Sequence, residues 1–71
     1  MNHLTIEIAS PSDRENLVAE IWQNDQMIAE INKEGEIFEL VIFATNPEGI
    51  KLKYDDFVDI LKRAKRKLIG G

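Results

Sequence analysis

The segment LVAEIWQNDQMIAEI, residues 17–31, constrains the fold most strongly, because apolar residues occupy nearly every position on both sides of Asn24-Asp25. Asn and Asp tolerate the left-handed backbone of a tight two-residue turn, and the flanking residues favour strands. The segment therefore predicts a β-hairpin in which Gln23 faces Gln26. Counting outward from the turn, this register makes the following pairs: Trp22 with Met27, Ile21 with Ile28, Glu20 with Ala29, Ala19 with Glu30 and Val18 with Ile31.

One further strand is predicted on each side of this hairpin. Apolar and polar residues alternate over residues 3–9, the pattern of a strand with one buried face. The turn from Asn32 to Gly35 is typical of a type I turn followed by a glycine bulge, and it places Ile31 opposite Ile37. A two-residue turn would instead exchange the two faces of the next strand. We therefore predict four antiparallel strands, at about residues 3–9, 17–23, 26–32 and 36–44.

Two connecting segments are compatible with more than one structure. Residues 12–15 have the spacing of a capping box and fit either one helical turn or an irregular loop. Residues 50–53 follow a loop that contains Pro47 and Gly49, and they fit a short edge strand whose lysines face water.

The apolar spacing becomes helical in the last third of the chain. Phe57, Leu61, Ala64 and Leu68 lie on one stripe of a helix, which we predict at about residues 54–69. Aspartates fall in its first turns and most of its bases in the last, as the helix macrodipole favours. We therefore expect the 71 residues to form a single small α+β domain, a four-stranded antiparallel β-meander with one C-terminal α-helix packed on one face (ββββα).

Both faces of the predicted sheet are apolar, whereas one helix covers about one face. We expect the helix to meet the more aliphatic face, in which Glu30 is surrounded by Leu17, Ala19, Ile21, Ile28, Phe38, Leu40 and Ile42. The other face is then open and has the composition of a recognition surface. Its residues are the predicted protein-binding site: Val18, Glu20, Trp22, Met27, Ile31, Glu39, Val41 and Phe43. In the alternative interpretation the helix packs on this second face and Trp22 is a core residue.

Charge is unevenly distributed along the chain, whose net charge is −4. Residues 1–50 carry ten acids and two bases, and residues 51–71 carry seven bases and three aspartates. An acidic rim around an apolar face suits a basic protein partner, because complementary charge accelerates encounter. The alternative ligand is nucleic acid, bound by basic residues of the predicted helix: Lys62, Arg63, Arg66 and Lys67.

These patterns favour a non-catalytic protein-binding module. By analogy of size and fold class, it would be a small bacterial inhibitor, immunity protein or antitoxin-like protein. A homodimer that buries the same open face is the alternative. We expect no enzymatic activity, cofactor or metal, because the sequence has no cysteine, a single histidine near its start and no phosphate-binding glycine loop. The lack of cysteine, of a leader-like segment and of a membrane-length apolar run favours a cytoplasmic location.

Overall fold

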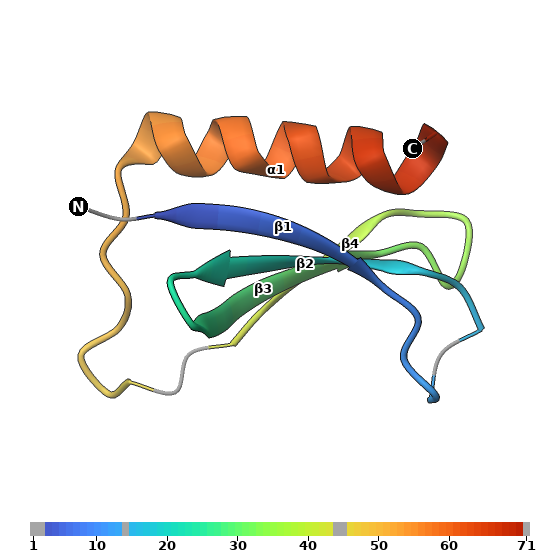
Figure 1. Cartoon of the computed structure of the whole chain (residues 1–71), viewed down its shortest axis with the longest axis horizontal. Coiled ribbons are helices and arrows are strands. Elements are labelled where there is room, and N and C mark those ends of the chain that lie inside the picture. Colours follow the sequence, from blue (N-terminus) through green and yellow to red (C-terminus); the bar gives the residue numbers. More distant parts are fainter. Residues whose placement is uncertain (1–2, 14, 44–45, 71) are drawn as a thin grey trace.

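A computed structural model of the chain describes residues 3–13, 15–43 and 46–70. It contains one antiparallel sheet, whose strands lie in their order along the chain, and a C-terminal helix on one side of that sheet (Figure 1). The elements have these bounds: β1 (Leu4–Ala9), β2 (Val18–Gln23), β3 (Gln26–Asn32), β4 (Glu39–Ile42) and α1 (Tyr54–Gly70). The predicted four-stranded meander with one C-terminal helix is confirmed. Within the described residues, no helix is both long and apolar enough to span a membrane.

The fourth strand begins later than predicted. Ile37, which the predicted register placed opposite Ile31, lies in the loop before β4 and is 69% exposed. Ile31 pairs instead with Leu40, so the predicted register of β4 was wrong. The physical reason is a longer connection than the predicted turn, in which Phe38 turns back and packs against the core. The predicted end of this strand, at residue 44, lies outside the described residues.

The described parts of the two connecting segments, residues 12–15 and 50–53, adopt different structures. Ser12 and Asp13 form a turn, while residue 14, part of the predicted capping box, lies outside the described residues. Residues 50–53 form no strand. Ile50 and Leu52 pack against the core instead, so this segment lines one end of the space between sheet and helix.

A β-bulge changes the register of the central hairpin. Beside the turn, Trp22 pairs with Met27 as predicted, and Asn24 has a left-handed φ of 57° whereas Asp25 does not. The register then shifts, and Ile28 is the extra residue of β3. Beyond it the pairs are Ile21 with Ala29, Glu20 with Glu30 and Ala19 with Ile31. The predicted pairs of this stretch were wrong, because a bulge sets two residues of one strand against one of the other.

The bulge explains why apolar residues follow one another without a polar residue between them. Ile28 and Ala29, although adjacent in the chain, are both buried in the core cluster beneath α1. Ile31 is buried in the same cluster, and Glu30 therefore faces the opposite side of the sheet. The prediction that Ile31 lies on the face away from the helix was wrong, as was the placement of Glu30 beneath the helix.

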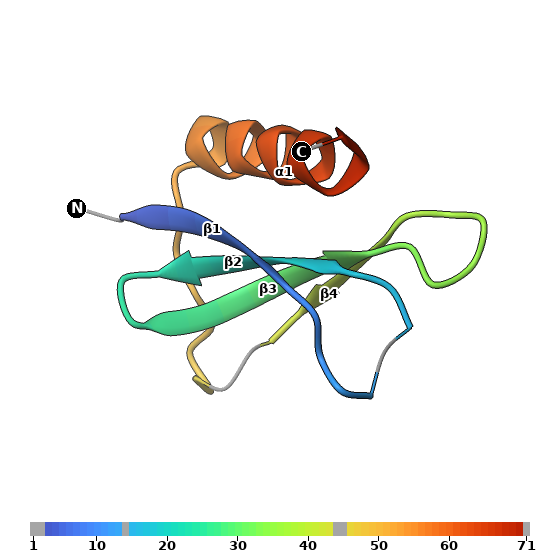
Figure 2. The ribbon, with the colours of Figure 1, turned by 45° about the vertical axis from the view of Figure 1, so that its right-hand side comes forward.

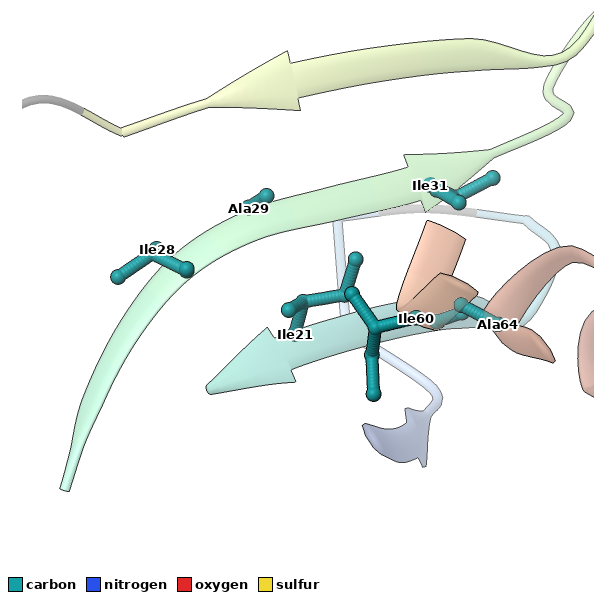
Figure 3. Packing of buried hydrophobic residues seen from close by; sticks show 7 residues of the cluster. Ile21, Ile28, Ala29, Ile31, Ile60 and Ala64 are labelled. Atoms are coloured by element: carbon teal, nitrogen blue, oxygen red, sulfur yellow. The ribbon is translucent and has the colours of Figure 1, made fainter. Parts of the chain in front are cut away.

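The core lies between α1 and the aliphatic face of the sheet, as predicted. Ile60 of α1 lies next to Ile21 of β2, Ala64 belongs to the same buried cluster, and the labelled core residues come from β2, β3 and α1 (Figure 3). Alanines at this contact let the helix approach the sheet closely, and Ala19 and Ala64 are both fully buried. Trp22 faces away from α1 and is not part of this cluster, so the alternative interpretation with Trp22 in the core was wrong.

The helix covers this face unevenly. In the described part of the chain, α1 packs along β1, β2 and β3, but no Cα atom of α1 lies within 8 Å of a Cα atom of β4. Figure 2 shows the same arrangement, with α1 beside β1 and with β4 at the far edge of the sheet. The residues of β4 that face the helix side are consequently exposed, Leu40 by 43% and Ile42 by 57%.

Candidate functional site

The side of the sheet away from α1, which we call the open face, carries every glutamate of the four strands. Glu7 pairs with Glu20, and Glu20 pairs with Glu30, so these three side chains form a row across three neighbouring strands, which we call the glutamate row. Glu39 lies on the same face, paired with Asn32. The strands contain no lysine or arginine, so the charges that they contribute to this face are all negative.

Two hydrogen bonds between side chains orient Glu20 and Glu30. The indole Nε1–H of Trp22 donates to Oε1 of Glu20 at 3.1 Å, and Nδ2 of Asn32 donates to Oε2 of Glu30 at 3.0 Å. Glu30 is only 6% exposed, Glu20 is half-buried and Glu7 is exposed, so the glutamate row runs from solvent toward the middle of the sheet. Oδ1 of Asn32 is buried and has no hydrogen-bond partner among the described residues.

A shallow hollow opens at the end of this face nearest the hairpin turn. Trp22 and the carboxylates of Glu7 and Asp25 line it, together with Thr5 and Asn24. An aromatic ring beside two carboxylates is the arrangement that binds a guanidinium or an ammonium group, through charge and through contact with the ring face. The hollow therefore suits a basic side chain.

The structure brings most of the predicted binding residues together but not all of them. Glu20, Trp22, Met27, Glu39 and Val41 lie on the open face. Phe43 follows β4, is half-buried, and its N–H donates to the carbonyl oxygen of Ile28 at 2.9 Å. Ile31 is in the core, as described above, and Val18 faces the open side but is fully buried, so neither side chain is accessible to a partner.

Sequence reasoning missed Glu7 and Glu30 as members of this face. Glu7 was recoverable, because it alternates with Ile6 and Ile8 and therefore points away from the buried side of β1. The position of Glu30 could not be predicted from alternation, because the bulge at Ile28 moves its side chain to the face away from the helix.

The basic residues proposed as the alternative nucleic-acid site lie on α1. Lys62, Arg63, Arg66 and Lys67 are all exposed. Nη1 of Arg63 lies 3.4 Å from Oδ2 of Asp59, an ordinary ion pair between residues four apart on a helix. No contact in the described structure draws the four bases toward one point, and their role in binding nucleic acid stays a prediction.

The described residues include no group of three or more histidine, cysteine, aspartate or glutamate side chains placed to hold a metal ion. Comparison with known proteins adds no assignment, because no family model, curated protein or solved structure matches this chain. The function is therefore argued from the geometry of the open face.

Proposed function

We propose that this chain is a non-catalytic protein-binding module that recognises a basic protein surface through its open face. The observation that carries the proposal is the pairing of Glu7 with Glu20 across neighbouring strands that contain no base. These two are the members of the glutamate row within reach of a partner, because Glu30 is only 6% exposed. Trp22 adjoins this row and donates a hydrogen bond to Glu20. Aromatic residues and charged partners of this kind contribute much of the energy of protein interfaces.

The pairing of Glu7 with Glu20 is unfavourable for the free chain. Like charges directly opposite each other on an antiparallel sheet cost roughly 0.2–1 kcal/mol per pair. A partner that places lysine or arginine against the row removes this repulsion and gains complementary charge. The same glutamate charges thus destabilise the free chain and stabilise its complex with a basic partner.

The hollow beside Trp22 indicates how a partner's basic side chain docks. A guanidinium group is planar, and it can stack on the indole while it donates hydrogen bonds to neighbouring carboxylates. Glu7 and Asp25 line the same hollow and supply those acceptors. The open face therefore favours an arginine-bearing partner.

Nucleases and other proteins that bind nucleic acid present basic surfaces of this kind. We therefore propose an inhibitor or immunity-type role, in which the open face covers a partner's basic site. Symmetric self-association, open face against open face, is less favourable, because two copies would bring the same glutamates together. The open face also repels nucleic acid, whose phosphates carry negative charge.

Two matched double substitutions test the proposal. Glu7→Gln with Glu20→Gln removes charge from the glutamate row, and the amide oxygen introduced at position 20 can still accept the Trp22 hydrogen bond. Glu36→Gln with Glu48→Gln removes the same charge from exposed loop positions. Binding proteins are captured from an extract of the source cells, and their affinities are measured by calorimetry with the full chain.

We expect the first pair to weaken binding about tenfold, which corresponds to two lost ion pairs. The same pair raises the free energy of unfolding of the free chain by about 0.5–1 kcal/mol, because repulsion is relieved. The loop pair changes neither quantity appreciably. Equal losses of affinity from both pairs, or captured partners that are acidic, would refute the proposal.

A further inference from the structure

A second apolar surface lies on the helix side of the sheet, between α1 and β4. It consists of two hollows, which together we call the α1–β4 groove. One hollow is lined by Ile28, Ile42, Ile50, Leu52, Tyr54 and Phe57. The lining of the other includes Phe38, Leu40, Leu61, Lys62 and Lys65. The hollows follow one another along the helix, since Leu40 and Ile42 are alternate residues of β4 and Phe57 and Leu61 are one turn apart on α1.

The groove lies over the one strand of the described sheet that α1 leaves uncovered, the edge strand β4. Neighbouring strands are about 4.8 Å apart and packed helices about 8–10 Å apart, so one helix covers about two strands. Coverage of all four strands on one face therefore takes more than one helix. This chain supplies α1 over β1 to β3, and β4 lies outside the reach of that helix.

The chemistry of the groove is apolar at one end and basic at the other. The hollow around Ile42 has no charged residue in its lining. Lys62 and Lys65 line the other hollow, where Glu39 is the one carboxylate. Nζ of Lys65 lies 4.7 Å from the centre of the Phe38 ring, and Lys33 approaches the same ring at 5.2 Å, so positive charge gathers at this end.

We propose that the α1–β4 groove binds an amphipathic helix of another protein, with apolar residues facing β4 and acidic residues facing Lys62 and Lys65. This inference concerns the helix side of the sheet, which shares only Glu39, at the start of the edge strand β4, with the open face. It stands without the proposed function. A small molecule fits less well, because the larger apolar hollow measures about 340 Å³, at the lower end for ligand sites, and is open to solvent. A second copy of this chain would bring the same lysines together.

Designed peptides of about 14 residues test the groove with the full chain. The acidic probe carries leucines at helical spacing and glutamates on both flanks, and the basic probe replaces those glutamates with lysines. A third probe contains two central prolines, which prevent a helix. Affinity is measured by fluorescence anisotropy at low and high salt, and the binding site is mapped by amide shifts in NMR spectra of the labelled protein.

We expect the acidic probe to bind about tenfold more tightly than the basic probe at low salt, with a smaller ratio at high salt. Its amide shifts cluster at Leu40, Ile42 and Leu61. The substitution Ile42→Glu abolishes binding, and this side chain is exposed enough for the fold to tolerate the change.

A charge reversal provides the sharper measurement. The double substitution Lys62→Glu with Lys65→Glu makes the basic probe bind more tightly than the acidic probe. The control is Lys53→Glu with Lys67→Glu, at exposed positions outside the groove lining, and it leaves the acidic probe the tighter binder. Four results would overturn the proposal: no binding of the acidic probe, equal binding of the proline probe, shifts confined to the open face, or a concentration-dependent dimer that protects Ile42.

Discussion

Truncation of Ile21 and Ile42 to alanine removes the same three carbons from the same face of the sheet, yet the two losses of stability should differ by about 2 kcal/mol or more. Ile21 is 0% exposed beneath α1, whereas Ile42 is 57% exposed on β4. At about 0.8 kcal/mol per buried methylene, full burial of three carbons contributes roughly 2.4 kcal/mol. The cavity left beneath the helix raises the cost of Ile21→Ala to about 3–4 kcal/mol.

At Ile42 about two fifths of the side chain is sheltered, so the same arithmetic predicts a loss of about 1 kcal/mol. Solvent fills the space that the substitution leaves, and no cavity term is added. The lower strand preference of alanine affects both positions and largely cancels in the comparison.

Equilibrium unfolding in urea, followed by far-ultraviolet circular dichroism, measures both losses. A chain of 71 residues has a free energy of unfolding of roughly 4–11 kcal/mol, so Ile21→Ala removes a large share of it. Ile21→Val, with an expected loss of about 1 kcal/mol, replaces it if the alanine variant does not fold. Equal losses for Ile21→Ala and Ile42→Ala would refute the uneven coverage of the sheet. An Ile42→Ala loss that grows with protein concentration would show that another copy covers β4.

Two further substitutions test other features. Trp22→Ala should weaken partner binding by about 2 kcal/mol or more. Circular dichroism should show that the fold is retained, because Trp22 lies outside the core cluster. Unfolding of this variant would place the indole in the core. Gly49→Ala should lower the free energy of unfolding by about 1–2 kcal/mol, because Gly49 has a left-handed φ of 83°. A Cβ at this position meets no neighbour within 4 Å, so backbone strain is the only cost of the substitution. Gly35→Ala is the matched control, with equal space and no left-handed φ, and should be neutral or slightly stabilising; equal losses at both glycines would contradict the strain argument.

The elements that could be predicted from the sequence are those set by local patterns. Asn24 begins the hairpin turn in the left-handed conformation, and the stripe from Phe57 to Leu68 marks the helix. The bulge could not be predicted in this way, because Ile28 and Ala29 fit a regular strand with two apolar faces equally well. Burial of both residues beneath α1 selects the bulge, and that is a tertiary effect.

The candidate site was predictable only in part for the same reason. The face of Trp22 followed from alternation along β2, and Glu20 and Met27 came with it. Glu30 joined them only through the shifted register, and the glutamate row was therefore missed. The lateral position of α1 depends on how the helix packs across the strands, which no period along the chain encodes, so the α1–β4 groove was missed as well.

The separation of charge between the open face and α1 makes the molecule an electric dipole. Its shortest dimension is 20 Å, whereas fields in physiological salt decay over about 8 Å. A macromolecule that approaches one pole is therefore screened from the charges of the other pole. It interacts with the local charge of that pole and not with the net charge of −4. At low ionic strength the poles attract one another, and copies should stack pole to pole until added salt disperses them.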